Sequence, residues 1–266
     1  VMGAGVTAFA ALVLVEAALI AVALVGTYAV STGAIAEWRV RTREAVRLLS
    51  EGWPLLLSGM AIMFYMRIDV LMLEAMVGLE AVGIYGGATR ISEAWYFVPT
   101  AVAAAAAPAI TAAHGRDPAG YLAGVRRLLG ILAAVALAAA LGLSLLSVPI
   151  VGLLLGREYA ASAPVLTVHA WAGVFVALGV GQGVWNVCEG LTRLALVRTL
   201  GGAAMNIVLN FILIPRFGTL GAAFATVVSY AVSAYILNAF DGRTRGIFRM
   251  QTEAMLLRGL LAPRAR

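Results

Sequence analysis

The feature that most constrains this chain is a succession of long apolar stretches that carry almost no charge. Each is about 20 residues or longer, the length that a helix needs to cross the hydrocarbon core of a bilayer. Seven such stretches can be marked, with Gly or Pro at most of their junctions. Their approximate limits are 5–31, 54–79, 82–112, 125–150, 163–188, 194–214 and 219–240. The sequence therefore predicts an all-α membrane protein with about seven transmembrane helices.

The composition agrees with a membrane protein and argues against nucleic acid as a partner. Hydrophobic residues make up 62% of the chain and charged residues 12%, whereas globular domains contain about half and about a quarter. A formal charge of +6 would suit nucleic-acid binding only if the basic residues formed one folded surface. They lie instead between the apolar stretches, so we expect membrane lipids, and no nucleic acid, as partners.

The arginines alternate from one connection to the next. Fifteen of the 19 basic residues follow or flank the first, third, fifth and seventh stretches, and the other connections hold only Arg157 and Arg216. By the positive-inside rule, the connections of the first group are cytoplasmic. We therefore expect the chain to begin outside the cell and to end in the cytoplasm.

The chain has few residues that could support redox, metal or nucleophilic chemistry. Cys188 is the only cysteine, and the two histidines, His114 and His169, are far apart in the sequence. No pattern resembling a catalytic triad is present. We expect no cofactor, no metal, no catalytic residue and no enzymatic activity.

Four charged residues lie deep inside the second and third apolar stretches: Arg67, Asp69, Arg90 and Glu93. A charge at the bilayer centre costs about 2.5 to 3.5 kcal/mol, so such residues mark a pathway, a ligand site or a structural pair. Counted from a shared outer turn, all four lie about 12 to 18 Å deep and form one layer. Arg90 and Glu93 share a helix face, whereas Arg67 and Asp69 point about 200° apart, so we expect only one of these two to face the same sector. We hypothesise that Arg67 or Arg90 attracts a phosphate or acidic sugar, while Asp69 and Glu93 hold the guanidinium groups. The alternative is a neutral quartet that only joins two helices.

Other polar residues within the apolar stretches are secondary candidates for the site. They are Glu16, Asn186, Glu189, Asn206 and Asn210. Glu16 and Glu189 are interpreted as buried or nearly buried carboxylates, and Glu16 could couple an ion or pair with another helix. Asn206 and Asn210 are spaced i,i+4 and share a helix face, where they would bond across a helix–helix seam or contact substrate.

The end of the fifth stretch and two Arg-rich segments complete the pattern. Gln182, Trp185 and Asn186 indicate a packing seam, with a sugar platform as the alternative. Residues 37–50 and 244–262 carry Arg among apolar residues at helical spacing. Both segments predict cytoplasmic amphipathic helices, lying either on an anionic leaflet or against a seam between lobes.

Three segments resemble a known family. Residues 206–230, NIVLNFILIPRFGTLGAAFATVVSY, closely resemble the last two helices of polysaccharide and O-antigen flippases, in the MATE-like MOP exporter superfamily. Residues 156–166 and the pair 65–69 and 82–90 are also similar to that family. Together these segments cover most of residues 53–240. The stretch from Asn206 is the most specific of them.

The resemblance implies two six-helix lobes around a cavity, through which a lipid-linked oligosaccharide is moved for cell-surface polysaccharide such as lipopolysaccharide. It implies a bacterial plasma membrane and an undecaprenyl-diphosphate-linked glycan. We expect residues 1–35 to hold the last helix of the N-terminal lobe, 36–52 a cytoplasmic linker, 53–240 the C-terminal lobe and 241–266 an Arg-rich cytoplasmic tail. The rest of the N-terminal lobe would be missing, as in a fragment.

Two other functions compete with a flippase. A cation-coupled multidrug exporter of the same superfamily would rely on acidic residues of the first lobe. A membrane-bound polysaccharide polymerase or ligase would need a large outer catalytic loop, whereas the longest outer connection is about 12 residues, near Gly156.

Overall fold

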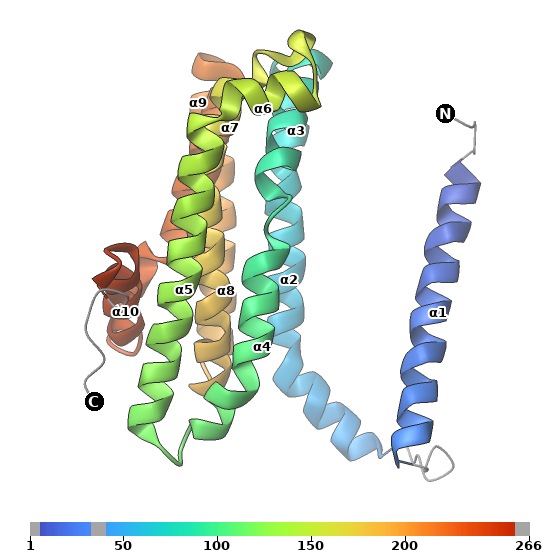
Figure 1. Ribbon diagram of the computed structural model, residues 1–266, viewed down its shortest axis with the longest axis vertical. Coiled ribbons are helices and arrows are strands. Elements are labelled where there is room, and N and C mark those ends of the chain that lie inside the picture. The colour runs from blue at the N-terminus through green and yellow to red at the C-terminus, as the bar shows by residue number, and fades with distance from the viewer. Residues whose placement is uncertain (1–5, 33–40, 259–266) are drawn as a thin grey trace. The chain divides into compact units, whose positions relative to one another are not determined.

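The computed structural model describes residues 6–32 and 41–258, except for some side chains of the first two helices, and in these residues every regular element is a helix (Figure 1). The α-helices are α1 (Val6–Thr32), α2 (Thr42–Met76), α3 (Leu79–Glu93), α4 (Phe97–Ala113), α5 (Pro118–Leu145), α6 (Ser147–Leu154), α7 (Ser162–His169), α8 (Ala172–Cys188), α9 (Thr192–Ala234) and α10 (Arg245–Met255). Two 3₁₀ turns are η2 (Arg157–Tyr159) and η3 (Ile236–Ala239). The all-α class is confirmed.

The chain divides into two compact units, Val1–Gly52 and Trp53–Arg266. The first unit holds α1 and the beginning of α2. The second holds the rest of α2 and all later helices, and it contains all the buried residues found among the described side chains. The assignment of these residues to lobes of a transporter stays a prediction.

Five helical stretches of the described residues are long and apolar enough to cross a membrane. They are Leu14–Ser31, Leu79–Ala113, Pro118–Leu145, Ser162–Cys188 and Thr192–Ala239. The predicted stretch 54–79 lies largely within α2, which is not among these five. The chain is therefore a multi-pass membrane protein.

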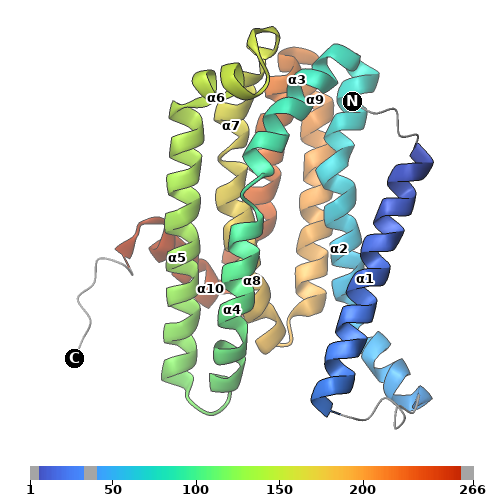
Figure 2. The same ribbon diagram turned by 45° about the vertical axis from the view of Figure 1, so that its right-hand side comes forward.

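Two of the predicted spans are interrupted. The stretch 82–112 forms α3 and α4 with a break at Ala94–Tyr96, and 163–188 forms α7 and α8 with a break at Ala170–Trp171 (Figure 2). The breaks pack together, since a Cβ placed on Gly173 would lie 2.6 Å from Cζ2 of Trp95. Both predicted spans are confirmed as stretches able to cross a membrane, whereas the breaks, which contain neither Gly nor Pro, were not predicted.

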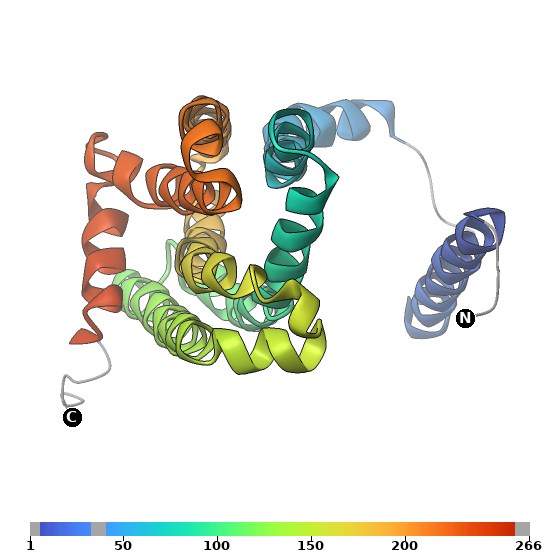
Figure 3. The ribbon, with the colours of Figure 1, turned by 90° about the horizontal axis from the view of Figure 1, so that it is seen from above.

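Helix α9 is a hairpin of two helices. At about 1.5 Å per residue, its 43 residues would extend roughly 65 Å, twice the thickness of the hydrocarbon core. Gly218 breaks it with φ 54° and ψ −129°, a conformation that favours glycine. Seen from above, the two halves lie side by side (Figure 3), and a Cβ on Gly202 would come 2.6 Å from Cβ of Ser233. The predicted turn at Gly218 is confirmed.

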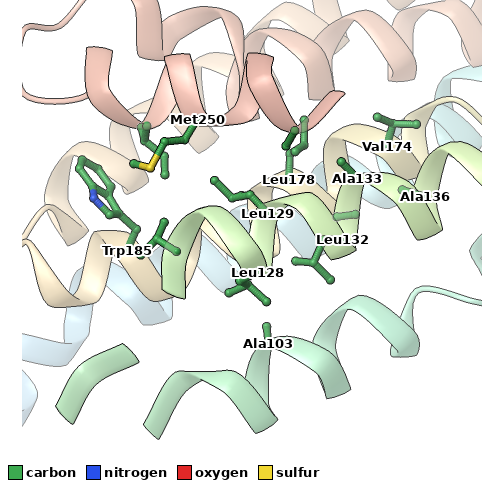
Figure 4. Close-up of a cluster of buried hydrophobic side chains, with 14 of the residues drawn as sticks. Ala103, Leu128, Leu129, Leu132, Ala133, Ala136, Val174, Leu178, Trp185 and Met250 are labelled. Atoms are coloured by element: carbon green, nitrogen blue, oxygen red, sulfur yellow. The ribbon is translucent and has the colours of Figure 1, made fainter. Parts of the chain in front are cut away.

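The second unit has two hydrophobic cores. One core, which we call the upper core, is formed by α2, α3, α6, α7 and α9. It includes Leu73, Tyr85, Val151, Leu166 and Ile214. The lower core is formed by α4, α5, α8 and α10, and Figure 4 shows its side chains meeting between these helices. Each interrupted span thus contributes one helix to each core. Helices α3 and α7 belong to the upper core, and α4 and α8 belong to the lower core.

Helix α10 packs against α5. Its apolar residues Ile247, Met250 and Ala254 belong to the lower core and are buried. This corrects the expectation that the apolar face of segment 244–262 lies on a leaflet, because α5 already covers that face. Residues 259–262, and residues 37–40 of the other Arg-rich segment, lie outside the described residues.

Candidate functional site

A buried carboxylate lies beside the upper core. Asp69 of α2 is only 3% exposed, and it accepts a hydrogen bond from the hydroxyl of Tyr85 in α3. The hydroxyl of Thr226 in α9 lies 3.4 Å from the same carboxylate oxygen, Oδ2. The backbone N–H of Val70 donates to Oδ1 at 2.8 Å. The consecutive helices α2 and α3 and the distant helix α9 therefore converge on one buried ionisable group.

A second buried pair extends this group to the helix breaks. Ser92, near the end of α3, and His169, the last residue of α7, are hydrogen-bonded between Oγ and Nδ1 at 2.5 Å. The His169 ring meets the Tyr85 ring edge to face, with centroids 6.0 Å apart. We call Asp69, Tyr85, Ser92, His169 and Thr226, together with the asparagine pair described next, the mid-bundle polar site.

Asn206 and Asn210 lie on one face of α9 and are fully buried. Nδ2 of Asn210 donates to Oδ1 of Asn206 at 3.0 Å, so the bond runs along the helix, not across a seam. Nδ2 of Asn206 and Oδ1 of Asn210 have no hydrogen-bond partner among the described residues. Because Gly202 packs on Ser233 in the hairpin, both asparagines lie at the level of Thr226. A buried amide with free hydrogen-bonding capacity needs an explanation, and a ligand is one.

The chemistry of this site suits a proton or a weakly held small cation. It offers one carboxylate, hydroxyl groups and an amide oxygen, which are hard oxygen ligands. In the part of the chain that the structure describes, no group of three His, Cys, Asp or Glu side chains could hold a metal ion. The described residues of the site therefore lack the ligand set of a structural metal centre.

The predicted layer of four charges is seen only in part: Glu93 interacts electrostatically with both Arg67 and Asp69. Arg67 and Arg90 are exposed, and none of the ion pairs found among the described residues joins them to Asp69 or Glu93. The prediction that both carboxylates hold guanidinium groups is corrected.

The reason is helical geometry. Residues two positions apart point about 200° apart around a helix, so burial of Asp69 turns Arg67 outward. Arg90 is likewise two positions from the buried Ala88. Glu93 is half-buried and interacts electrostatically with Arg67 and Asp69. Among the described residues it has no ion pair with Arg67.

The secondary carboxylates are more exposed than expected. Glu189 lies at the end of α8, where it accepts a 2.8 Å hydrogen bond from Tyr121 and has Nε2 of His114 3.8 Å away. Its side chain is 36% exposed, which corrects the interpretation as a nearly buried group. Glu16 is exposed within its own unit. Asn186 is buried, and its Oδ1 has no partner among the described residues.

A separate buried polar cluster includes Gln182, which the sequence placed in a packing seam, but its other members were not predicted. Asn238 is its centre: its Oδ1 accepts from Nε2 of Gln182 at 2.9 Å and from Arg198. Its Nδ2 donates to Oε1 of Gln182 at 3.0 Å and to Oε1 of Gln251 at 2.9 Å. Arg198 also donates to Thr244 at 2.6 Å. We call these five residues the amide knot.

The knot corrects the interpretation of Arg198 as an arginine of a connection, because the side chain is 5% exposed inside the bundle. A signal was present in the sequence. Gln251 lies on the same helical face as the apolar residues Ile247 and Ala254, where a polar side chain needs a buried partner.

Comparison with known proteins identifies relatives. A family model described as "Polysaccharide biosynthesis protein" matches residues 1–164. The chain is 30% identical over 230 residues to the probable flippase AglR of Haloferax volcanii, an alignment that covers 82% of this chain and 46% of that protein. The chain thus spans about half the length of this curated relative. No solved structure matches the chain significantly.

Proposed function

Because this chain belongs to the polysaccharide biosynthesis protein family, we propose that it is part of a flippase-type transporter, and not an enzyme, that moves a lipid-linked oligosaccharide across the plasma membrane. The relative described as a probable flippase supports a transporter. Residues 53–240 would form its C-terminal lobe and α1 the last helix of the other lobe. The substrate would be a glycan carried on undecaprenyl diphosphate, and the C-terminal residues would lie in the cytoplasm.

The observation that carries this proposal is the exposure of Arg90 on the membrane-spanning stretch Leu79–Ala113 and of Arg67 within the predicted apolar stretch 54–79. An arginine in contact with lipid tails at that depth costs about 2.5 to 3.5 kcal/mol or more. The surface with these residues therefore faces a polar space, as a substrate cavity between two lobes would provide. A guanidinium binds phosphate oxygens through two parallel N–H donors, which suits a diphosphate.

The mid-bundle polar site supplies a second part of the proposal. A transporter must change conformation around its substrate, and an ion that binds one conformation better shifts the population toward it. Asp69 is buried behind the face that carries Arg67, and it lies beside the packed breaks of α3–α4 and α7–α8. We infer that ion or proton binding at Asp69 biases the bend of these helices.

The test is a complementation experiment in the host cell, with the native gene removed and variants Arg67→Gln, Arg90→Gln and the double variant supplied. A hydrogen-bonded contact to a charged group contributes about 1.5 to 3 kcal/mol. Each single variant should therefore reduce surface polysaccharide roughly tenfold or more. Membrane levels of each variant are measured by immunoblot, so that lost protein is not read as lost transport.

Arg157→Gln is the matched control, because Arg157 is an exposed arginine in a connection between helices. Its polysaccharide should equal that of the wild type. Normal surface polysaccharide in the double variant Arg67→Gln/Arg90→Gln would refute the role of these arginines.

A further inference from the structure

The 3₁₀ turn η3, the residues after it and helix α10 together form a segment, residues 236–255, that we call the corner. The corner is held rigidly on the bundle. Its inner side is fixed by the amide knot, in which Asn238, Thr244 and Gln251 are all fully buried. Its apolar residues fill the lower core against α5. Nε of Arg245 donates to the backbone carbonyl of Ala239 at 3.3 Å, which closes the turn. The outer face of the corner is thus presented in a fixed geometry.

The outer face has an excess of positive charge. Residues 236–258 contain four arginines, all exposed, and two carboxylates. Each carboxylate already has an arginine beside it: Asp241 accepts from Arg243 at 2.9 Å, and Oε2 of Glu253 lies 4.0 Å from Nε of Arg126 in α5. The bonds from Arg243 lower the pKa of Asp241 to about 2, so this carboxylate is ionised at neutral pH.

Arg245 and Arg249 remain without a carboxylate partner among the described ion pairs. They are spaced i,i+4, so they project from one face of α10. The buried Arg198 lies behind this corner, with only amide and hydroxyl partners in its hydrogen bonds. The local potential is therefore positive and favours an anionic partner.

The position of the corner along α5 coincides with a membrane interface. Leu128–Leu145 of α5 is a run of 18 residues without a charge, about 27 Å long at the helical rise. This length nearly matches the hydrocarbon core of a bilayer, roughly 30 Å. Arg126, at the end of that run, contacts α10 through Glu253. Helix α10 therefore lies at the level of the lipid headgroups, along the edge of the bundle beside α5 (Figure 3).

Large apolar side chains accompany these arginines. Phe240, next to Arg245 in the closed turn, is 77% exposed, and Leu256 is 54% exposed. Exposed aromatic and aliphatic side chains beside arginines are typical of a surface that contacts acyl chains and headgroups together.

We propose that the outer face of the corner, centred on Arg245 and Arg249 with Phe240, binds the anionic headgroups of membrane phospholipids. The amide knot preorganises this surface, because it fixes the position of the helix that carries the arginines in the absence of bound lipid. The inference goes beyond the proposed transport function and does not depend on it.

The experiment measures lipid retained by the purified full chain. The protein is equilibrated with mixed micelles that contain phosphatidylglycerol and phosphatidylcholine in equal amounts, and bound lipids are counted by native mass spectrometry. Each arginine near an anionic surface contributes about fivefold to binding. The double variant Arg245→Gln/Arg249→Gln should therefore retain phosphatidylglycerol roughly thirtyfold less tightly, with phosphatidylcholine unchanged.

The matched control is Arg157→Gln/Arg216→Gln, which removes two exposed arginines elsewhere in the chain. It should retain phosphatidylglycerol as the wild type does. An equal loss in both double variants would show nonspecific attraction to net charge and overturn the proposal, as would no loss in either. Displacement of the lipid by an equal concentration of inorganic phosphate would also overturn it, because a phosphate pocket would then explain the binding.

Discussion

Two groups of buried polar side chains lie in the same bundle, and their hydrogen bonding differs. In the amide knot, Asn238 is bonded to Gln182, Arg198 and Gln251, and none of the buried polar atoms found without a partner in the described part of the chain belongs to the knot. In the mid-bundle polar site, Asn206 and Asn210 each keep one polar atom without a partner among the described residues. Burial alone therefore does not show whether the hydrogen bonding of a polar cluster is complete.

The difference lies in what each group can still bind. A fully satisfied network adds rigidity and fixes one arrangement of its helices. An incompletely satisfied network loses stability unless a water, ion or ligand completes it. The knot joins α8, α9, η3 and α10, whereas the mid-bundle polar site lies beside the two breaks that interrupt α3–α4 and α7–α8.

The largest stability effect is expected from Asn238→Leu. This change leaves the buried Arg198, Gln182 and Gln251 without their common partner, which should cost about 3 to 5 kcal/mol. For a chain of this size, the midpoint of thermal unfolding should fall by roughly 10 °C. Circular dichroism of the purified chain in detergent measures the shift. A midpoint within about 2 °C of the wild type would show that the knot does not hold α10.

A smaller loss is expected from Gly173→Ala at the packed helix breaks. The added methyl would lie 2.6 Å from the Trp95 ring, and such overpacking costs about 1 to 3 kcal/mol. Gly183→Ala is the control on the same helix, because a Cβ there meets no atom within 4 Å. It should be neutral or stabilising by up to about 1 kcal/mol. Equal midpoints for the two variants would mean that the breaks are not packed together.

The smallest loss is expected from the double change Asn206→Leu and Asn210→Leu. The one bond between these side chains disappears with both partners, and no described residue loses a hydrogen bond. The free energy of unfolding should change by about 1 kcal/mol or less. A loss as large as that of Asn238→Leu would remove the contrast between the two clusters, because it would show that the asparagines already have strong partners.

Much of the fold could be predicted because apolar length and glycine position are local signals. The turn at Gly218 and the helical class follow from residues close in sequence. The breaks could not be located in that way, since Ala94–Tyr96 and Ala170–Trp171 contain neither Gly nor Pro. One hint was available: the predicted span 82–112 has 31 residues, about 46 Å of helix, more than a bilayer requires. The position of the break within this long stretch lies at a tertiary contact, that of Trp95 with Gly173, which the sequence does not reveal.

The site was predicted in part. Asp69 stood out as a charge in an apolar run, but its partners lie 16 and 157 residues away, and no pattern in the sequence links them. Charge complementarity suggested arginine partners for Asp69. Helix geometry excluded Arg67 as a partner of Asp69, because residues two positions apart on one helix cannot both point into the bundle.

The amide knot also has a consequence for how such a chain can evolve. Asn238 is hydrogen-bonded to Gln182, Gln251 and Arg198 at once. A substitution at one of these positions therefore leaves buried polar groups of the others without a hydrogen-bond partner. Effects of substitution within the set will be strongly non-additive. A sequence could leave this arrangement only by replacing several residues together with a well-packed apolar set, since each single step passes through a less stable protein. The four side chains are therefore inherited as a unit, and we expect them to covary among relatives that retain α10.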